Sequence, residues 1–471
     1  MARVLLILPH LPQRMGAPYL GQQYIAASLL ARGHEVKCID LSALLYKGND
    51  DDAVAEAERF GPDMIGMTLF TYNAHRGYAL IPRLRKVARL IIAGGPHVTV
   101  LPHEALAHGF DAAVVGEGEL VVQRIAAALD APKNLLTPLL AAVGAIPGVL
   151  TKDSPVGHGT AVDLSPDDLD ALPFPHTSYP TFDASLYSPS GLIAAGGMMT
   201  SRGCPARCTF CANYVTGRGY RFRSTDSILR EMESLSERWK ITNFPFWDDA
   251  FTARRPRLEA LCDGILASDE LSGATWTCIT PGNMVKPFDL ERMRAAGCVA
   301  INFGLESGDY NVLKQIQKGQ RPEQVKAAVK AAKSVGMVTI VNFMFGFPGE
   351  GVAELSNTLR LMEELSVDTD YFNTRGVLVP FPGTQIYDET VRDYDFAGWW
   401  LDPAKVPDEA AIFGLSGEDA MTLAEVDPTL ALDFFRYPDD VRELIARCVR
   451  FKARHNRKTI EGFQRGYGAA A

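Results

Sequence analysis

The sequence predicts an α/β protein with a parallel, doubly wound sheet, a partial barrel of six parallel strands and a small helical C-terminal region. Short apolar runs alternate with amphipathic stretches in two separate series, turn-forming residues gather between the series, and the final stretch has mainly helical propensity. A chain of 471 residues is long enough for two or three domains. We expect an N-terminal domain at 1–130, a linker at 131–196, the barrel at 197–389 and the helical region at 390–471.

The first series of apolar and amphipathic stretches predicts the N-terminal domain. Amphipathic stretches such as 21–32 and 79–87 predict helices, and the apolar runs between them predict strands at 4–8, 35–39, 64–68, 90–93 and 112–115. Strands that alternate with helices are joined by right-handed crossovers, which makes the sheet parallel. Ligands of such sheets bind at the carboxyl ends of the strands. The candidate ligand loops are therefore 9–20, 69–78, 94–97 and 116–119.

The second series predicts the partial barrel. Its apolar runs lie at 198–201, 244–247, 275–279, 300–304, 338–345 and 376–379. In barrels of parallel strands the chemistry gathers on the loops at the carboxyl ends of the strands. We therefore expect reactive residues directly after these runs.

Charge and hydropathy exclude several classes of protein. The formal net charge of −9 disfavours nucleic-acid binding, because phosphate backbones are held mainly by a surplus of Lys and Arg. No apolar run approaches the roughly 20 residues of a membrane span, and residues 1–9 carry no signal-peptide pattern. We therefore expect a cytoplasmic protein that acts on a small molecule and has no nucleic-acid or membrane partner.

Three of the eight cysteines, Cys204, Cys208 and Cys211, lie together directly after the first strand of the second series. Thiolates bind cubane iron–sulfur clusters, and three of them leave one iron without a protein ligand. An open metal position is a place for a substrate. The alternative is a zinc site, but no His or fourth Cys lies at the short spacing that zinc motifs use.

The spacing Cys-x3-Cys-x2-Cys, with the aromatic Phe210 before the last cysteine, closely resembles the signature of the radical S-adenosylmethionine (SAM) superfamily. The resemblance implies a 4Fe–4S cluster whose open iron chelates the amino and carboxylate groups of SAM. It also implies that one electron from the cluster breaks the sulfonium bond and yields a 5'-deoxyadenosyl radical. A flavodoxin- or ferredoxin-type donor, or a separate reductase, would supply that electron.

Three motifs at later strand ends extend the resemblance to the residues that contact SAM. Asp248 and Asp249 resemble the residues that contact the methionine portion, with Asp248 as the better candidate. Glu306 and Ser307 resemble the polar residues that meet the methionine carboxylate and the ribose. Phe345 and Gly346 resemble the segment that packs the adenine. Helix capping by the acids and simple turns at the glycines are the alternatives. These residues are Asp248, Asp249, Glu306, Ser307, Phe345 and Gly346.

Small residues in the first series resemble the Rossmann-like cobalamin-binding domain that precedes the barrel in one branch of this superfamily. The positions are Gly94, Gly95, His97, Gly116 and Glu117. Glycine lets the backbone approach a flat ligand, and His97 is either a hydrogen-bond partner of corrin side chains or a structural residue. The text around residues 73–77 lacks the Asp-x-His-x-x-Gly pattern of mutase-type domains. The resemblance therefore implies a cobalamin whose lower face is not held by a protein histidine.

Methylation is the leading hypothesis for the reaction: the radical removes a hydrogen from an unactivated carbon of a small natural product, and methylcobalamin supplies the methyl group. The alternative is a vestigial first domain and radical dehydration of a vicinal diol in an aminoglycoside-type substrate. That route needs a proton or electron donor, for which Tyr214 and Tyr220 are candidates. A tetrapyrrole cyclase and a tRNA-modifying enzyme are further alternatives, and the acidic composition disfavours the latter.

Two groups of residues near the C-terminus keep open alternatives. The acids Asp388 and Glu389, together with the pair Trp399–Trp400, either line a pocket for a polar substrate or are surface acids and a packed aromatic pair. The second group is a solvated helix face or docks an acidic flavodoxin. It consists of Arg447, Arg450, Lys452, Arg454 and Arg457.

Overall fold

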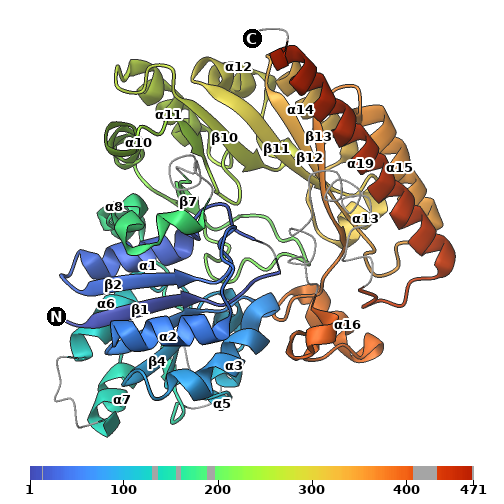
Figure 1. Cartoon of the computed structure of the whole chain (residues 1–471). Helices are drawn as coiled ribbons and strands as arrows, with labels where there is room; N and C mark the ends of the chain where they lie inside the picture. Colours follow the sequence, from blue (N-terminus) through green and yellow to red (C-terminus); the bar gives the residue numbers. More distant parts are fainter. Residues whose placement is uncertain (13, 130–135, 155–160, 188–196, 407–431, 469–471) are drawn as a thin grey trace.

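A computed structural model of the protein describes residues 1–12, 14–129, 136–154, 161–187, 197–406 and 432–468. These residues form two α/β domains and a long C-terminal helix (Figure 1). We call the described residues up to 187 the first domain, residues 197–384 the second domain and the described residues from 385 on the C-terminal region. Within the described ranges, no helix combines the length and the hydropathy that a membrane span requires.

The first domain contains a six-stranded sheet in the order β2-β1-β3-β4-β5-β6. The five expected strands are present and pair in parallel: β1 Arg3–Leu8, β2 Glu35–Asp40, β3 Met64–Thr68, β4 Leu90–Gly94 and β5 Ala112–Val114. The sixth strand, β6 (Val149–Thr151), pairs antiparallel with β5 and lies in the segment that we expected to be a linker. It closes the edge of the sheet beside β5.

Helices cover both faces of this sheet, as the alternating series predicts. They are α1 Leu20–Leu30, α2 Asp50–Phe60, η1 Thr71–Asn73, α3 Ala74–Leu84, α4 Pro96–Val100, α5 Pro102–Ala107, α6 Glu119–Ala128 and α7 Leu136–Gly144. The expected linker adds α8 Pro166–Ala171, η2 Pro175–Thr181 and η3 Ala184–Leu186. This segment packs onto the domain, because η2 contacts α1 and the Tyr187 hydroxyl donates to Asp40 at 2.9 Å.

Five of the six strands expected in the barrel form the second sheet, in the order β13-β12-β11-β10-β9. All neighbours pair in parallel: β9 Asn243–Pro245, β10 Thr275–Thr280, β11 Cys298–Glu306, β12 Val338–Phe345 and β13 Tyr371–Val377. The remaining run contributes one parallel bridge, from Met198 to Phe246. It is short because β7 (Ser201–Arg202) leaves the sheet and pairs antiparallel with β8 (Arg221–Phe222). The barrel is therefore partial.

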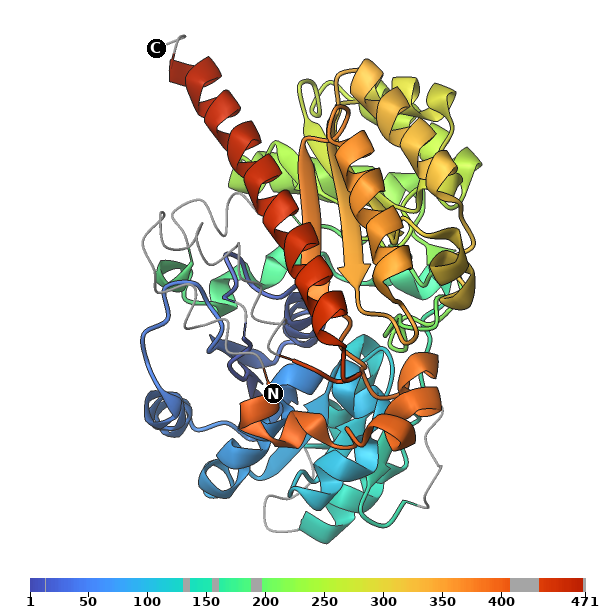
Figure 2. The same cartoon turned by 90° about the vertical axis from the view of Figure 1, so that its right-hand side faces the viewer.

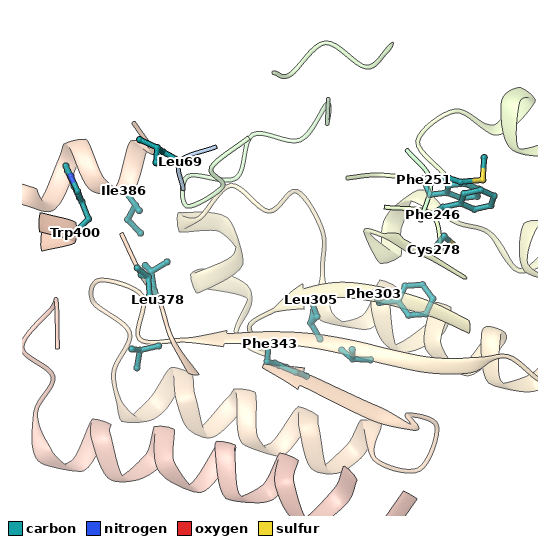
Figure 3. Close-up of a cluster of buried hydrophobic side chains, with 14 of the residues drawn as sticks. Leu69, Phe246, Phe251, Cys278, Phe303, Leu305, Phe343, Leu378, Ile386 and Trp400 are labelled. Atoms are coloured by element: carbon teal, nitrogen blue, oxygen red, sulfur yellow. The ribbon is translucent and has the colours of Figure 1, made fainter. Parts of the chain in front are cut away.

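Helices pack on the outer face of the second sheet. They include α10 Thr225–Trp239, α11 Arg255–Ala267, η4 Gly282–Met284, α12 Pro287–Ala295, α13 Tyr310–Gln315, α14 Pro322–Ser334 and α15 Val352–Leu365. In β12 buried and half-buried residues alternate, because one face meets these helices and the other faces the barrel interior. Figure 3 shows Phe303 and Phe343 of the buried set, and it places Phe246, Phe251 and Cys278 together at another end of the same core.

The C-terminal region connects the two domains. It contains α16 Gln385–Tyr394, η5 Trp399–Leu401, η6 Pro403–Lys405 and α19 Asp439–Gly468, and α19 runs along the edge of the second domain in Figure 2. Trp399 and Trp400 are both buried, and their ring centroids are 5.9 Å apart. The Trp400 indole donates to Glu104 of the first domain at 3.0 Å. The tryptophans are therefore a packed pair that joins the domains.

Candidate active site

The loop between β7 and β8, residues 203–220, carries the three cysteines, and we call it the cluster loop. Gly203 begins it with a φ of +84°, and an added Cβ atom there would collide with the backbone of Gly219. The backbone N–H of Thr209 donates to Ile316 at 3.0 Å, and Ile386 N–H donates to the Thr209 carbonyl at 3.0 Å. The loop is thus held from two sides across the mouth of the barrel.

The three thiols lie near one another in a partly buried setting. Burial raises the pKa of Cys204, Cys208 and Cys211, and neighbouring thiols of the trio raise it further at Cys208 and Cys211. Cys211 keeps part of its surface exposed, yet surrounding protein atoms and Cys208 raise its pKa to about 12. No three His, Cys, Asp or Glu side chains in the described residues are arranged for a single ion. The fit to a multi-iron cluster therefore rests on the donor chemistry, since metal binding relieves this clustered negative charge.

A buried ion pair stands beside the cluster loop. The ammonium of Lys318 lies 2.7 Å from Glu306 and 5.8 Å from the centre of the Phe210 ring. Burial opposes the charge of Lys318, but the Glu306 and Cys208 anions outweigh it and raise its pKa. Gly304 makes room for the pair, because an added Cβ would lie 2.9 Å from Glu306 and 3.1 Å from Lys318. Lys318 is not among the residues expected from the sequence, since only the fold brings it to the cysteines.

Asp248 is buried and is hydrogen-bonded to other groups of the protein. Its carboxylate accepts hydrogen bonds from the Thr200 N–H at 2.6 Å and from the Ser201 hydroxyl at 2.6 Å, and it lies 3.3 Å from Arg257. Arg257 also donates to the Tyr220 hydroxyl at 3.2 Å. Asp248 and Tyr220 therefore belong to one network that ties β7 to the end of β9. This geometry reverses the expected preference for Asp248 over Asp249.

Asp249 remains exposed next to the cluster loop. It accepts hydrogen bonds from Asn213 at 3.2 Å and from Thr216 at 3.3 Å, both on that loop. Tyr214 lies between these two residues, and burial, followed by the nearby Cys211, raises its pKa. The two acids therefore differ in burial although they are neighbours in the sequence, since Asp248 is buried and Asp249 is exposed.

The other expected SAM contacts are buried in the packing of the second domain. Ser307 is fully buried, and its hydroxyl lies 3.2 Å from that of Thr358 on α15. Phe345 is also fully buried. The Gly346 carbonyl accepts a hydrogen bond from the Tyr437 hydroxyl at 2.7 Å, and a side chain at this glycine, whose φ is +75°, would collide with Tyr437. These residues shape the end of β12 and bind the C-terminal region to it.

A cavity of about 620 Å³ lies between the two domains, and we call it the interdomain cavity. The first domain supplies the carboxyl ends of its strands and the segment 14–25. The second domain supplies six residues, two of which belong to the cluster loop: Gly197, Met199, Arg202, Val215, Thr216 and Trp247. Trp247 is 55% exposed and forms part of the cavity wall.

Four of the five residues expected at cobalamin line this cavity, namely Gly94, Gly95, Gly116 and Glu117. Gly95 has a φ of +101°, and an added Cβ would lie 2.8 Å from the Leu69 carbonyl. Gly94 is different, since its nearest neighbour would be Val114 at 3.7 Å, an ordinary contact. A larger side chain at Gly94 would therefore fill the cavity rather than disrupt the strand.

His97 does not line the cavity, which favours the structural role over a hydrogen bond to corrin side chains. It is buried, and its Nε2 lies 3.0 Å from Glu104 and 3.1 Å from the Tyr78 hydroxyl. Its ring packs 5.6 Å from that of Trp400. The helix that begins after Gly95 turns His97 away from the strand ends, so that it supports the docking of the C-terminal region.

Charged side chains join the domains beside the cavity. Arg202 of β7 lies 3.1 Å from Glu117 and 2.6 Å from Glu119, and Arg221 of β8 lies 2.7 Å from Glu117. Arg202 and both acids are buried. The position of the cluster loop is thereby coupled to the loop that follows β5.

The cavity fits a flat, largely apolar cofactor that both domains hold. Its wall consists mainly of glycines and apolar side chains with few charges, and the glycines at strand ends let the ligand approach the backbone. No histidine is among the described residues that line it. Tyr72, a bulky residue of a candidate ligand loop, packs instead against Phe381 and Trp399 at 5.3 and 5.7 Å.

Family comparisons agree with this division of the chain. Residues 16–126 match the B12 binding domain, and residues 198–362 match the radical SAM superfamily. An uncharacterised methyltransferase of Pyrococcus horikoshii is 28% identical over 402 residues, which cover 83% of each chain. Bacteriochlorophyllide d C-12(1)-methyltransferase of Chlorobaculum tepidum is 28% identical over 344 residues, covering 71% of this chain and 68% of the relative.

Solved structures share the two-domain fold. The radical SAM methyltransferase TsrM from Kitasatospora setae, solved with cobalamin and a 4Fe–4S cluster, aligns with a TM-score of 0.65 at 18% identity over 84% of this chain and 79% of its own. The cobalamin-dependent SAM radical enzyme OxsB aligns with a TM-score of 0.64 at 19% identity, and covers 84% of this chain and 56% of its own. At these identities the likeness concerns the fold.

Proposed function

We propose that this chain, which combines a B12-binding domain with a radical SAM domain, is a cobalamin-dependent radical SAM methyltransferase. Its reaction would transfer a methyl group from SAM to an unactivated carbon of a small molecule. One SAM molecule would provide the methyl group, and a second would provide the radical that removes hydrogen from that carbon. The methyltransferase names of several relatives support the reaction type. Two of these names give different substrates, a cytidylyl-2-hydroxyethylphosphonate and a bacteriochlorophyllide.

One observation carries this proposal: the interdomain cavity is walled by the strand ends of the first domain and by Val215 and Thr216 of the cluster loop. A cofactor in the cavity would thus lie next to the loop that holds the three thiols. A methyl donor and a radical source must both reach the same carbon, so their sites have to be neighbours. The charged contacts of Arg202 with Glu117 and Glu119 hold these sites together.

Residues of this chain would have distinct parts in the reaction. When bound, cobalamin would supply the methyl group and the 4Fe–4S cluster the electron that breaks the sulfonium bond. Cys204, Cys208 and Cys211 would hold the cluster, and the Lys318–Glu306 pair would balance charge beside it. The glycine loops and Trp247 would exclude water from the cofactor face, as reactive radicals require.

The substrate and the electron donor also belong to this proposal. We propose a small-molecule substrate that enters between the domains, and a flavodoxin- or ferredoxin-type protein that reduces the cluster. Tyr214 lies within the cluster loop, next to the cysteines, whereas Tyr220 is bonded to Arg257. For the alternative dehydration, which needs a proton or electron donor, Tyr214 is therefore the better placed of the two.

Anaerobic purification with cobalamin supplied, followed by a visible spectrum and metal analysis, tests the proposal. We expect a corrinoid band beside the iron–sulfur band, and both S-adenosylhomocysteine and 5'-deoxyadenosine after addition of SAM and dithionite. Replacing Cys204, Cys208 and Cys211 by Ala should abolish 5'-deoxyadenosine, while Cys262→Ala, a lone cysteine in α11, should retain it. Iron–sulfur absorption without any corrinoid would instead favour radical dehydration, and 5'-deoxyadenosine from the triple variant would refute the cluster assignment.

A further inference from the structure

A second hollow lies beside the cluster loop, outside the interdomain cavity, and we call it the basic groove. Its volume is about 680 Å³, and it is lined by residues of the cluster loop, of η4 and of the segment 310–324. Four cations are among its lining residues, namely Arg207, Lys314, Lys318 and Arg321, and no Asp or Glu is among the described residues that line it. We propose that this groove docks an acidic one-electron carrier protein that reduces the cluster, an inference that rests on the proposed function.

The charge of the groove stands out against the rest of the molecule. The whole chain has a net charge of −9, so a groove whose charged lining residues are all cations differs from the average surface. Lys318 is paired with Glu306, which leaves Arg207, Lys314 and Arg321 as exposed cations. Complementary charge steers an acidic partner into place and raises its association rate.

An aromatic ring holds two of these cations in position. The guanidinium of Arg321 lies 4.3 Å from the centre of the Tyr310 ring, and the ammonium of Lys314 lies 5.9 Å from it. Tyr310 is itself 37% exposed and lines the groove. Cations that rest on a ring lose less side-chain freedom on binding, which favours a stable protein–protein contact.

The groove also brings a partner close to the thiols. Arg207 lies in the cluster loop between Cys204 and Cys208, and Pro205 and Ala206 form the adjoining wall. Electron transfer becomes slower as the distance between redox centres increases, so a carrier that contacts these residues has a short path. In the step itself the reduced carrier loses one electron and the oxidised cluster gains it, with no change in covalent bonds.

The basic residues of α19 are the alternative that the sequence analysis raised. That helix packs on β13 and α15, where Phe451 and His455 contact Phe372 on the outer face of the second sheet. The exposed α19 cations therefore lie on a packed outer helix rather than on the cluster loop. Arg447 and Arg454 of this helix offer a matched control for the groove.

The test compares two double variants of the cobalamin- and cluster-loaded protein. Lys314→Gln/Arg321→Gln removes two charges from the groove, and Arg447→Gln/Arg454→Gln removes two from α19. The probe is a recombinant acidic flavodoxin, whose dissociation constant is measured at low and at high salt. We expect the groove variant to bind about fivefold or more weakly at low salt, and the α19 variant to change less than about twofold.

Reduction by a small reagent separates this inference from the proposed function. Dithionite needs no docking site, so both variants should reduce their cluster with dithionite at the rate of the unmodified protein. A groove variant that binds flavodoxin as tightly as the unmodified protein, or an α19 variant that is weakened to the same degree, would overturn the docking assignment. Failure of methyl transfer with dithionite in the unmodified protein would instead count against the proposed function alone.

Discussion

Replacing Arg202 by Met tests the charged contact between the domains. Arg202 is 6% exposed and lies 2.6 Å from Glu119 and 3.1 Å from Glu117. In the variant Glu117 keeps Arg221 at 2.7 Å, but Glu119 loses its one ion-pair partner among the described contacts, and its Oε2 has no hydrogen bond to begin with. Leaving a buried charge without its partner costs about 3–5 kcal/mol, so we expect a loss of that size in the free energy of unfolding.

Urea unfolding under anaerobic conditions measures this loss, and retention of cobalamin reports on the interdomain cavity that Arg202 lines. The second change Glu119→Gln removes the orphaned charge, so the double variant should regain about half of the lost stability. Arg3→Met is the matched control, because Arg3 forms an exposed pair with Glu35 and its loss should cost less than about 1 kcal/mol. An Arg202→Met protein within about 1 kcal/mol of the unmodified one would refute the reasoning.

Two further predictions concern the cavity and a buried acid. Gly94→Leu should fill part of the cavity and weaken cobalamin binding about tenfold or more. Gly94→Ala is the control, because its methyl group would meet only Val114, and this variant should bind cobalamin nearly normally. Equal affinities of the two variants in spectrophotometric titrations would contradict this prediction. Burial raises the pKa of Glu350 from its ordinary value of 4.5 to about 8 in the folded protein. The folded state therefore holds this proton more tightly than the unfolded state does. The resulting stabilisation is complete below about pH 4.5 and is lost as the pH rises to about 8. The amide side chain of Glu350→Gln cannot ionise. Between pH 5 and 8.5 the free energy of unfolding of this variant, measured with urea, should therefore rise relative to that of the unmodified protein by as much as about 4 kcal/mol. A difference in stability that stays constant with pH would exclude this explanation.

Much of the fold was predictable because its signal is local and repeated. The runs at 4–8, 35–39 and 64–68 became β1, β2 and β3 with bounds that differ by a residue or less at most ends. The strand β6 escaped prediction because its three residues lie in a segment rich in turn-forming residues, and its pairing with β5 is a long-range contact. The run at 198–201 was expected to be a full strand, but the pairing of β7 with β8 shortens it to one bridge.

The residues of the candidate site also divide into those that a local sequence pattern predicts and those that only the fold brings together. The spacing of Cys204, Cys208 and Cys211 is a property of eight consecutive residues, and the structure keeps them on one loop. Asp248 was expected to contact SAM, and His97 either to contact the corrin or to be structural. Asp248 is instead hydrogen-bonded to Thr200, 48 positions away, and His97 to Glu104 and Tyr78, 7 and 19 positions away. No local pattern marks Lys318 as a neighbour of the cysteines, because more than one hundred residues, including several strands and helices, separate them in the chain.

By itself, the sequence determined where most strands lie along the chain, the series of parallel crossovers and the chemistry of the three thiols, because these depend on side chains within a few positions of one another. The tertiary structure alone decided which polar side chains remain open, since a hydrogen bond such as that from Trp400 to Glu104 joins residues nearly three hundred positions apart. It also decided that the interdomain cavity lies next to the cluster loop. Both outcomes follow from the packing of two domains against each other, in which each buried polar group must find a partner wherever the fold brings one.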